Sequence, residues 1–160
     1  MKHLVTIGVY GWDLDSFLAA LRSSGVRLLL DVRQRRGVRG REYSWANAVR
    51  LQSALAGAEV AYRHHKELAP TTELRRLQYA EDARLGVGKR SRIELAPAYR
   101  DGYTREILDH VQLAPIVERL PLRGASALLC VERDAEACHR SLIAERIAAR
   151  HDVIVRHLRP

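Results

Sequence analysis

The stretches 26–32, VRLLLDV, and 125–131, ASALLCV, decide the fold of this 160-residue chain. Each is a short, mostly apolar run followed by loop residues, and each is too short to be an independent helix. Runs of this kind predict strands that are buried on both faces. Such strands belong to parallel sheets covered by helices, and we therefore expect an α/β fold.

Three further strands are predicted on either side of this pair, at His3–Val9, Glu59–Arg63 and Val153–Leu158. The five strands alternate with amphipathic helices. This order predicts three layers, with a mostly parallel five-stranded sheet between helices on both faces. Because no linker, repeat or low-complexity segment interrupts the pattern, residues 1–160 are expected to form a single domain.

Helix boundaries are predicted from capping residues and prolines. Side chains that can accept hydrogen bonds from first-turn amides are expected to begin three of the helices. These expected caps are Asp13, Ser44 and Asp134. A further helix is expected to start at Pro70–Thr72. Another follows Pro97 and is divided by Pro115, because proline interrupts helical hydrogen bonding.

Composition excludes several classes of protein. Hydrophobic residues make up 47% of the chain and charged residues 29%, which is typical of a folded globular protein rather than a disordered one. No apolar run approaches the ~20 residues that cross a bilayer, and no signal peptide is recognisable. With only Cys130 and Cys138, the chain is not a disulfide scaffold, and we expect free thiols in the cytoplasm.

The charge balance is basic, with 27 Lys and Arg against 19 Asp and Glu, a net charge of +8. Most of these cations are arginines, whose planar guanidinium groups can bind phosphate through bidentate hydrogen bonds. The expected partner is therefore nucleic acid or a phosphate-bearing small molecule. The alternative is that the cations lie singly on solvated surfaces and bind nothing specific.

Side chains that can take part in catalysis or ligand binding come directly after several of the predicted strands. In an open parallel sheet the carboxyl ends of the strands share one edge, where ligands bind. The residues expected at that edge are Gly8, Tyr10, Asp31, Arg33, His64, Cys130 and Glu132, together with Cys138, His139, Arg140 and Ser141 at the last helix. We therefore predict an anion-accepting cleft at the strand ends.

Roles can be assigned to the members of this cleft. Cys130 or Cys138 is the expected nucleophile, since a thiolate is stabilised near a helix N-terminus and arginine, and His139 is the expected general acid or base. Arg33, oriented by Asp31, and Arg140 are expected to hold the anion. The remaining strand-end residues would bind the substrate. The alternative roles are structural, with Cys130 a core thiol and Asp31–Arg33 an ion pair that orders a loop.

Two loops are rich in cations and could contact a nucleic-acid backbone without catalysis. The expected patch consists of Arg35, Arg36, Arg39, Arg41, Lys89, Arg90 and Arg92. Tyr43 and Trp45 lie among the first group, and cations interleaved with aromatic rings suit phosphates and stacked bases. A non-catalytic nucleic-acid-binding module is therefore the alternative function.

Familiar cofactor motifs are absent from the sequence. There is no GxGxxG, no P-loop and no G-x-S-x-G, and neither C-x-x-C nor H-x-x-x-H supports a metal site. We therefore expect no cofactor and no metal.

Four blocks resemble a bacterial and archaeal family, the domain of unknown function 488. They are Thr6-Ile7-Gly8, Leu29–Arg33, Glu67–Thr71 and Cys130–Ser141, of which the last is the most specific. The resemblance implies a compact α/β domain and names no reaction. Members commonly carry a histidine after Thr-Ile-Gly. This chain has Val9 at that position, so any role of the histidine is either missing here or taken by His64 or His65.

A weaker similarity connects the chain to rhodanese-type domains. These also place Asp-Val-Arg after a strand, here residues 31–33, and follow a strand-end cysteine with a loop and Arg-Ser, here Cys130 and Arg140-Ser141. The similarity is an analogy at the level of the fold.

Overall fold

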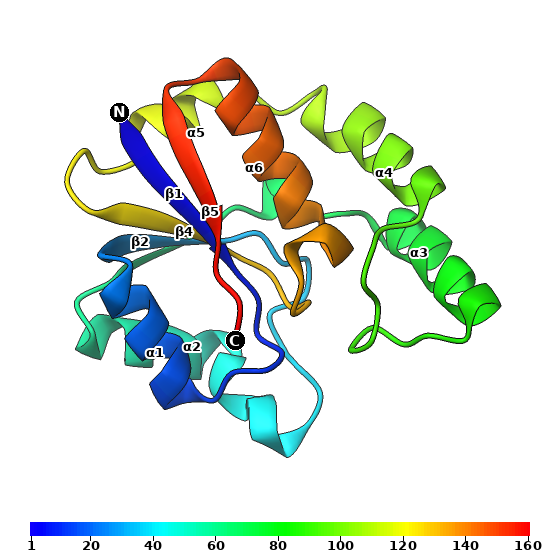
Figure 1. The fold of residues 1–160 in the computed structure, drawn as a ribbon, viewed down its shortest axis with the longest axis horizontal. Coiled ribbons are helices and arrows are strands. Elements are labelled where there is room, and N and C mark those ends of the chain that lie inside the picture. Colours follow the sequence, from blue (N-terminus) through cyan, green and yellow to red (C-terminus); the bar gives the residue numbers. More distant parts are fainter.

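The sheet has five strands, all of them parallel, in the order β3-β2-β4-β1-β5 (Figure 1). A computed structural model describes all 160 residues. The strands are β1 (Lys2–Ile7), β2 (Val26–Asp31), β3 (Ala61–His64), β4 (Ala125–Leu129) and β5 (Val153–His157). The predicted α/β class and the five parallel strands are confirmed, and each strand lies within one or two residues of the predicted bounds.

The two stretches that decide the fold are neighbours at the centre of the sheet. Strand β4 pairs with β2 on one side and with β1 on the other, and Leu128 lies opposite both Leu30 and Thr6. Every residue of β4 is buried, whereas the edge strands β3 and β5 alternate between exposed and partly buried positions. Continuous apolar runs therefore form the central strands.

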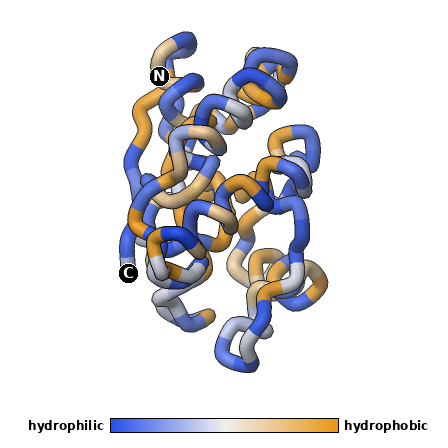
Figure 2. The backbone as a smooth tube through the Cα atoms, turned by 90° about the vertical axis from the view of Figure 1, so that its right-hand side faces the viewer, coloured by the Kyte–Doolittle hydropathy of each residue, from blue (hydrophilic) through white to orange (hydrophobic).

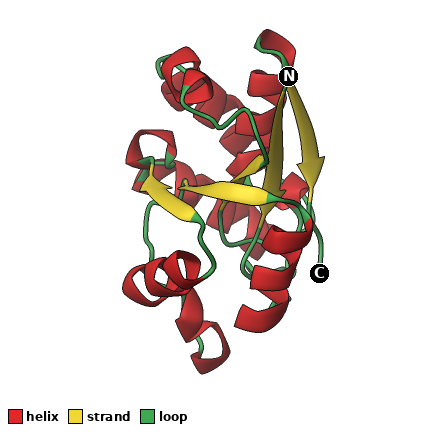
Figure 3. Ribbon diagram, turned by 90° about the vertical axis from the view of Figure 1, so that its left-hand side faces the viewer, coloured by secondary structure: helices red, strands yellow, loops and turns green.

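Helices cover both faces of the sheet. In Figure 1, α1 (Leu14–Ser23) and α2 (Ala48–Gly57) lie below it, and α5 (Ala114–Glu118) and α6 (His139–Arg150) lie above it. Helices α3 (Thr72–Leu85) and α4 (Pro97–Tyr103) pack against each other at one side. Figure 3 shows the same layers from the left, with strands between helical groups.

Short helices complete the chain. Three are 3-10 helices, Arg41–Ala46, Lys66–Leu68 and Ala135–Ala137, and a π-helical turn, Thr104–Leu108, continues α4. Two of the three predicted caps were wrong. Ser44 lies inside the first 3-10 helix, and α2 begins after Asn47. Asp134 precedes only a 3-10 turn, so that α6 begins after Cys138.

The third predicted cap is confirmed. The carboxylate of Asp13 accepts a hydrogen bond from the Ser16 amide at 2.8 Å, and the Ser16 hydroxyl accepts one in return from the Asp13 amide. Pro115 lies in the first turn of α5, so it divides the segment after Pro97 as predicted.

Apolar residues form one core of 39 buried side chains. Figure 2 shows apolar and polar positions alternating along the helices, as expected for helices with one buried side. None of the helices is long and apolar enough to cross a membrane.

The connections define a crevice at one edge of the sheet. After β2 the chain continues to β3, whereas after β4 it continues to β5, on the opposite side of the sheet. Loops that leave neighbouring parallel strands in opposite directions open a gap at their carboxyl ends. The end of β2, at Asp31, and the end of β4, at Leu129, therefore mark the place where a ligand site is expected.

Candidate active site

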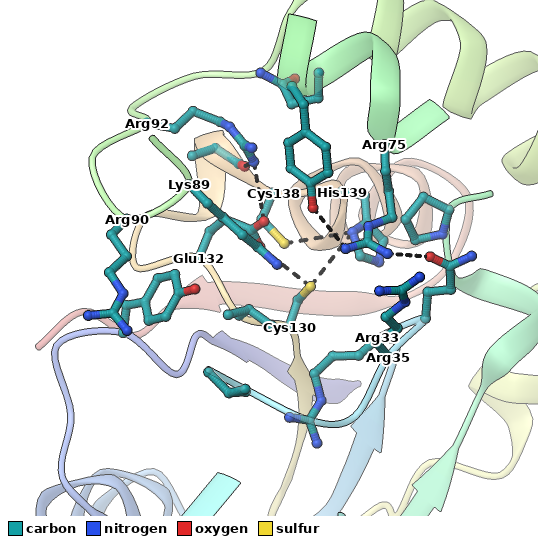
Figure 4. A pocket seen from close by; sticks show the side chains of 18 of the residues that line it. Arg33, Arg35, Arg75, Lys89, Arg90, Arg92, Cys130, Glu132, Cys138 and His139 are labelled. Atoms are coloured by element: carbon teal, nitrogen blue, oxygen red, sulfur yellow. Dashed lines mark hydrogen bonds and ion pairs between the residues drawn. The ribbon is translucent and has the colours of Figure 1, made fainter. Parts of the chain in front are cut away.

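A pocket of about 890 Å³ opens at this crevice. Its walls come from the loop after β2, the loop after β4, the start of α6, and the α3–α4 arm with its connecting loop (Figure 4). The residues that line it and were predicted at the site or in the basic patch are Tyr10, Arg33, Arg35, Arg39, Lys89, Arg90, Arg92, Cys130, Glu132, Cys138 and His139.

Two thiols and one imidazole form the floor of the pocket. His139 Nδ1 lies 3.8 Å from Cys130 Sγ and 3.8 Å from Cys138 Sγ, and the three atoms lie within 4.8 Å of one another. All three side chains are at least 95% buried in the fold, yet all three line the pocket. A small molecule in the pocket would therefore meet both sulfurs.

The orientation of His139 is fixed from behind. Its Nε2 lies 2.9 Å from the main-chain carbonyl of Val32, which can only accept a hydrogen bond, so Nε2 carries a proton. Nδ1 is then the nitrogen that faces the thiols. The ring also packs against Tyr103, with centroids 5.3 Å apart. This is the arrangement of a histidine that exchanges a proton with a cysteine.

Cys138 is the more acidic thiol. Burial by itself would raise the pKa of Cys138, but the adjacent Cys130 thiol and the positive charges of His139 and Arg140 outweigh burial and hold this pKa well below its usual value. Cys138 also occupies the N-cap of α6, where the helix dipole favours an anion. Of the two thiols, Cys138 is therefore the one that loses its proton more readily.

The pKa of Cys130 is shifted in the opposite direction to that of Cys138. Burial, the hydrogen bond with Cys138 and the nearby negative charges raise the pKa of Cys130 well above its usual value. Its thiol donates a hydrogen bond to Glu132 Oε2 at 3.5 Å. The pKa of His139 is also raised: burial disfavours the charged ring, but the charge of Cys138 more than compensates. These directions favour a Cys138 thiolate beside a His139 imidazolium, with Cys130 kept as a thiol.

Glu132 brings negative charge to the same floor. Burial and the Cys138 thiolate raise the pKa of its carboxyl group. Arg92 donates a hydrogen bond to Glu132 Oε1 at 3.2 Å and also pairs with Asp82 at 2.6 Å. Lys89 is half-buried and points towards the floor in Figure 4. Burial by itself would lower the pKa of Lys89, but the negative charge of Glu132 outweighs burial and raises it.

The predicted Asp31–Arg33 pair is present and fully buried. The guanidinium donates two hydrogen bonds to the Asp31 carboxylate, at 2.9 and 2.8 Å, and a third to the carbonyl of Ala46 at 2.8 Å. The Tyr62 hydroxyl donates to the same carboxylate at 2.6 Å. Arg33 lines the pocket, but Asp31 balances its charge and each of its three side-chain nitrogens already donates one hydrogen bond to the protein. Asp31 lies behind it, outside the lining.

Arg140 does not face the pocket, contrary to our expectation. Its guanidinium is 0% exposed and donates to the carbonyl of Glu132 at 2.6 Å, to that of Arg133 at 3.2 Å and to Thr6 Oγ1 at 3.3 Å. Donors already bound to these oxygens cannot hold a substrate. Arg140 therefore shapes the loop after β4 and acts on Cys138 through its charge.

Gly8 explains part of the Thr6-Ile7-Gly8 block. A Cβ atom at this position would lie 1.9 Å from the carbonyl oxygen of Glu132. Only glycine lets β1 end so close to the loop that carries Cys130 and Glu132. Gly8 therefore supports the pocket from behind and is not among its lining residues.

Three other expected residues also lie outside the pocket. His64 Nε2 lies 3.0 Å from the carbonyl of Arg33, and His65 Nδ1 pairs with Glu67 at 2.6 Å. The Ser141 hydroxyl donates to the carbonyl of Cys138 at 2.9 Å, which supports the start of α6. His139 is consequently the one histidine that reaches the pocket.

The mouth of the pocket carries cations that have no acidic partner. Arg35 and Arg39 are exposed and form no ion pair, and neither does Lys89. Arg90 differs, since it pairs with Glu42 at 2.9 Å and lies 5.3 Å from the ring centre of Tyr10. The other two members of the predicted patch, Arg36 and Arg41, do not line the pocket.

Sequence reasoning missed the wall contributed by the α3–α4 arm. Arg75, Gln78 and Tyr79 of α3 and Tyr99 of α4 line the pocket. Arg75 is a further cation without an acidic partner, and it donates to Gln34 at 2.7 Å and to Tyr79 at 2.8 Å. The spacing of Arg75, Gln78 and Tyr79 along one helix face was the available signal.

Cys130, Cys138 and His139 are the only group of donor atoms placed closely enough to share a metal ion. Thiolate and imidazole are donors that zinc prefers. A structural zinc ion needs four ligands, however, and these residues supply three.

Fold and floor together define an α/β domain with a thiol–imidazole pocket at the carboxyl ends of its parallel strands. The chain matches the family described as Domain of unknown function DUF488 over residues 13–147, and it belongs to that family. No curated protein and no solved structure matches it.

Proposed function

We propose that this protein is a cysteine-dependent enzyme that acts on an anionic, phosphate-bearing substrate, with Cys138 as its nucleophile. One observation carries the proposal. The Cys138 sulfur, at the N-cap of α6 and 3.8 Å from His139 Nδ1, lies on the floor of a pocket whose mouth holds unpaired cations. A nucleophile, its proton partner and an attraction for anions therefore share one cavity.

The floor supports a covalent first step. The Cys138 thiolate forms a bond to an electrophilic atom of the substrate, and the bond from that atom to its leaving group breaks with its electron pair. The imidazolium Nδ1–H of His139 then gives its proton to the departing group. Val32, through its carbonyl, holds the ring in the same tautomer before and after this transfer.

The mouth selects the charge of the substrate. Arg35, Arg39, Arg75 and Lys89 have no acidic partner, so their charges remain available to an incoming anion. Guanidinium groups bind phosphate oxygens through bidentate hydrogen bonds, which favours phosphate esters and nucleotides as the substrate class. Two buried free thiols also fit a reducing compartment, and we place the activity in the cytoplasm.

A non-catalytic nucleic-acid-binding module remains the second candidate. It is favoured by the exposure of Arg35, Arg39 and Arg41 on one loop, part of which lies outside the pocket. In that case affinity for an oligonucleotide would fall steeply with salt and would not depend on Cys138.

Alkylation by two reagents of different charge tests the proposal. Iodoacetamide is neutral and iodoacetate is an anion of similar size. We expect both reagents to modify Cys138 before Cys130 at neutral pH. The ratio of the iodoacetate rate to the iodoacetamide rate should be higher for Cys138 than for a free thiol such as glutathione. Inorganic phosphate should slow both reactions, and Cys138→Ser should abolish them whereas Cys130→Ser should not.

Two results would overturn the proposal. Equal, slow alkylation of both cysteines would remove the nucleophile. Rapid alkylation of Cys138 with no preference for iodoacetate and no protection by phosphate would remove the anionic substrate. If an oligonucleotide binds the Cys138→Ser variant with unchanged affinity while phosphate fails to protect, the nucleic-acid module is the better account.

A further inference from the structure

We propose that Cys138 is a site of reversible oxidation by hydroperoxides, and that Cys130 resolves the oxidised sulfur into a Cys130–Cys138 disulfide that switches the pocket off. The inference rests on the reactive Cys138 of the proposed function and adds a second substrate class and a role for Cys130. The first observation is the placement of a second, protonated thiol within 4.8 Å of the reactive sulfur.

Proximity makes the disulfide attainable. A sulfur atom moves by roughly 3 Å when its side chain changes from one staggered rotamer to the next. The two sulfurs lie at most 4.8 Å apart, and an S–S bond needs them at about 2.05 Å. Cys130 follows the end of β4 and Cys138 precedes α6, so a rotation of the side chains can join them without breaking either element.

The pocket admits small molecules such as a peroxide, while the fold keeps the cysteines of other protein chains away from the two sulfurs. Both cysteines line the pocket but are 5% and 1% exposed. Hydrogen peroxide is only slightly larger than water and can reach them. A second protein chain cannot, and intramolecular resolution by Cys130 is therefore the available route.

His139 can serve both chemical steps, because its Nδ1 is equally distant from the two sulfurs. In the first step the Cys138 thiolate attacks one peroxide oxygen and the O–O bond breaks. The departing hydroxide takes the Nδ1 proton and leaves as water, and Cys138 becomes a sulfenic acid. The sulfur is oxidised by two electrons and the peroxide is reduced.

In the second step the neutral imidazole accepts the proton of the Cys130 thiol. The Cys130 sulfur attacks the sulfenic sulfur, hydroxide leaves with that proton as a second water, and the disulfide forms. Glu132, which accepts the hydrogen bond of the Cys130 thiol at 3.5 Å, keeps this sulfur oriented before it reacts. Overall, two thiols and one peroxide give one disulfide and two waters.

The sequence allows a direct test. Trypsin cleaves after Arg123, Arg133 and Arg140, so it separates a peptide with Cys130 from a peptide with Cys138. After treatment of the full chain with one equivalent of hydrogen peroxide, we expect residues 124–133 and 134–140 to be joined by a disulfide under non-reducing conditions. Both free thiols should disappear together, and dithiothreitol should restore both thiols and the alkylation of Cys138.

Two variants separate the roles of the cysteines. In Cys130→Ala, which removes the resolving sulfur and keeps a small apolar side chain, dimedone should trap a sulfenic acid on Cys138. Without dimedone, a second equivalent of hydrogen peroxide should oxidise the sulfenic acid of the same variant to the irreversible sulfinic acid, with release of a further water. In Cys138→Ser, peroxide should leave Cys130 reduced.

Several outcomes would overturn the inference. They are oxidation of Cys130 before Cys138, a disulfide only between two copies of the chain, and a disulfide that forms only after a chelator has removed bound metal. Rapid alkylation of Cys138 without any disulfide would reject this inference alone. Failure of Cys138 to be alkylated would reject the proposed function as well.

Discussion

The floor and the mouth of the pocket contrast in how their charges are held. Around the floor, Arg33 and, outside the lining, Arg140 are fully buried, and both guanidinium groups are bound to oxygens of the protein. At the mouth, Arg35 and Arg39 are exposed and have no partner. Burial demands partners for a charge, whereas water satisfies a charge at the surface.

This contrast indicates what each arginine can do. A buried guanidinium that is held by oxygens of the protein contributes to folding and to the electric field at the thiols. An unpaired guanidinium at the mouth can exchange water for a substrate anion. Substitutions on the floor should therefore affect stability and thiol chemistry, and substitutions at the mouth should affect the preference for anions.

The largest effect is expected for Asp31→Ala. It leaves Arg33 buried without its counter-charge, and removal of one partner from such a pair costs about 3–5 kcal/mol of unfolding free energy. Arg39→Ala at the mouth should change this free energy by less than about 0.5 kcal/mol. Urea denaturation monitored by circular dichroism compares the two. An ordinary point mutation costs about 1 kcal/mol of unfolding free energy. A smaller loss for Asp31→Ala would mean that the pair is dispensable for stability.

Gly8→Ala should have the next largest effect. The new methyl group would meet the Glu132 carbonyl at 1.9 Å, so the loop after β4 must move, and overpacking of this kind costs about 1–3 kcal/mol. Since the same loop carries Cys130, alkylation of Cys138 should slow as well. Gly57→Ala is the matched control, because no atom lies within 4 Å of its Cβ. Equal stability of the two variants would contradict the steric role of Gly8.

The substitution His139→Asn tests whether the reactivity of Cys138 comes from the low pKa of its thiol or from its accessibility to the reagent. Loss of the imidazolium removes a charge that lowers the pKa of Cys138, so this pKa should rise. At pH values below the pKa of both proteins, each unit of rise reduces the thiolate fraction about tenfold. The rate of alkylation by iodoacetamide, measured against pH, should therefore begin to fall at a higher pH in the variant. The deficit should vanish in alkali, where both proteins carry the thiolate. A deficit that persists there would indicate a misfolded or closed pocket.

Much of the floor could be predicted from the sequence. The carboxyl ends of parallel strands must share one edge, and that rule alone brought Cys130 and Glu132 into the same cavity as Arg33. It failed for Arg140, because the direction of a long side chain depends on nearby carbonyls that become visible only in the folded structure. The acidity of Cys138 depended in the same way on hydrogen bonds and on the start of α6, which our capping assignment misplaced.

The mouth was harder to predict. Composition identified its cations, but it could not separate Arg35, which lines the pocket, from Arg36, which donates to Tyr62 at 3.3 Å. The contribution of Arg75 depends on how the α3–α4 arm packs beside the sheet. Such packing is set by long-range contacts and not by local periodicity.

The smallest effect is expected at the mouth, where the double substitution Arg35→Glu and Arg39→Glu reverses two exposed charges. Exposed charges are screened by salt over a Debye length of about 10 Å and act weakly on the thiol, so the preference for iodoacetate over iodoacetamide should fall only about threefold. The rate with neutral iodoacetamide and the stability should remain unchanged. Added salt should reduce the preference in the unmodified protein and have little effect on the variant. If salt affects both proteins equally, the attraction for anions comes from other cations, and the proposed division between floor and mouth would have to be redrawn around Arg75 and Lys89.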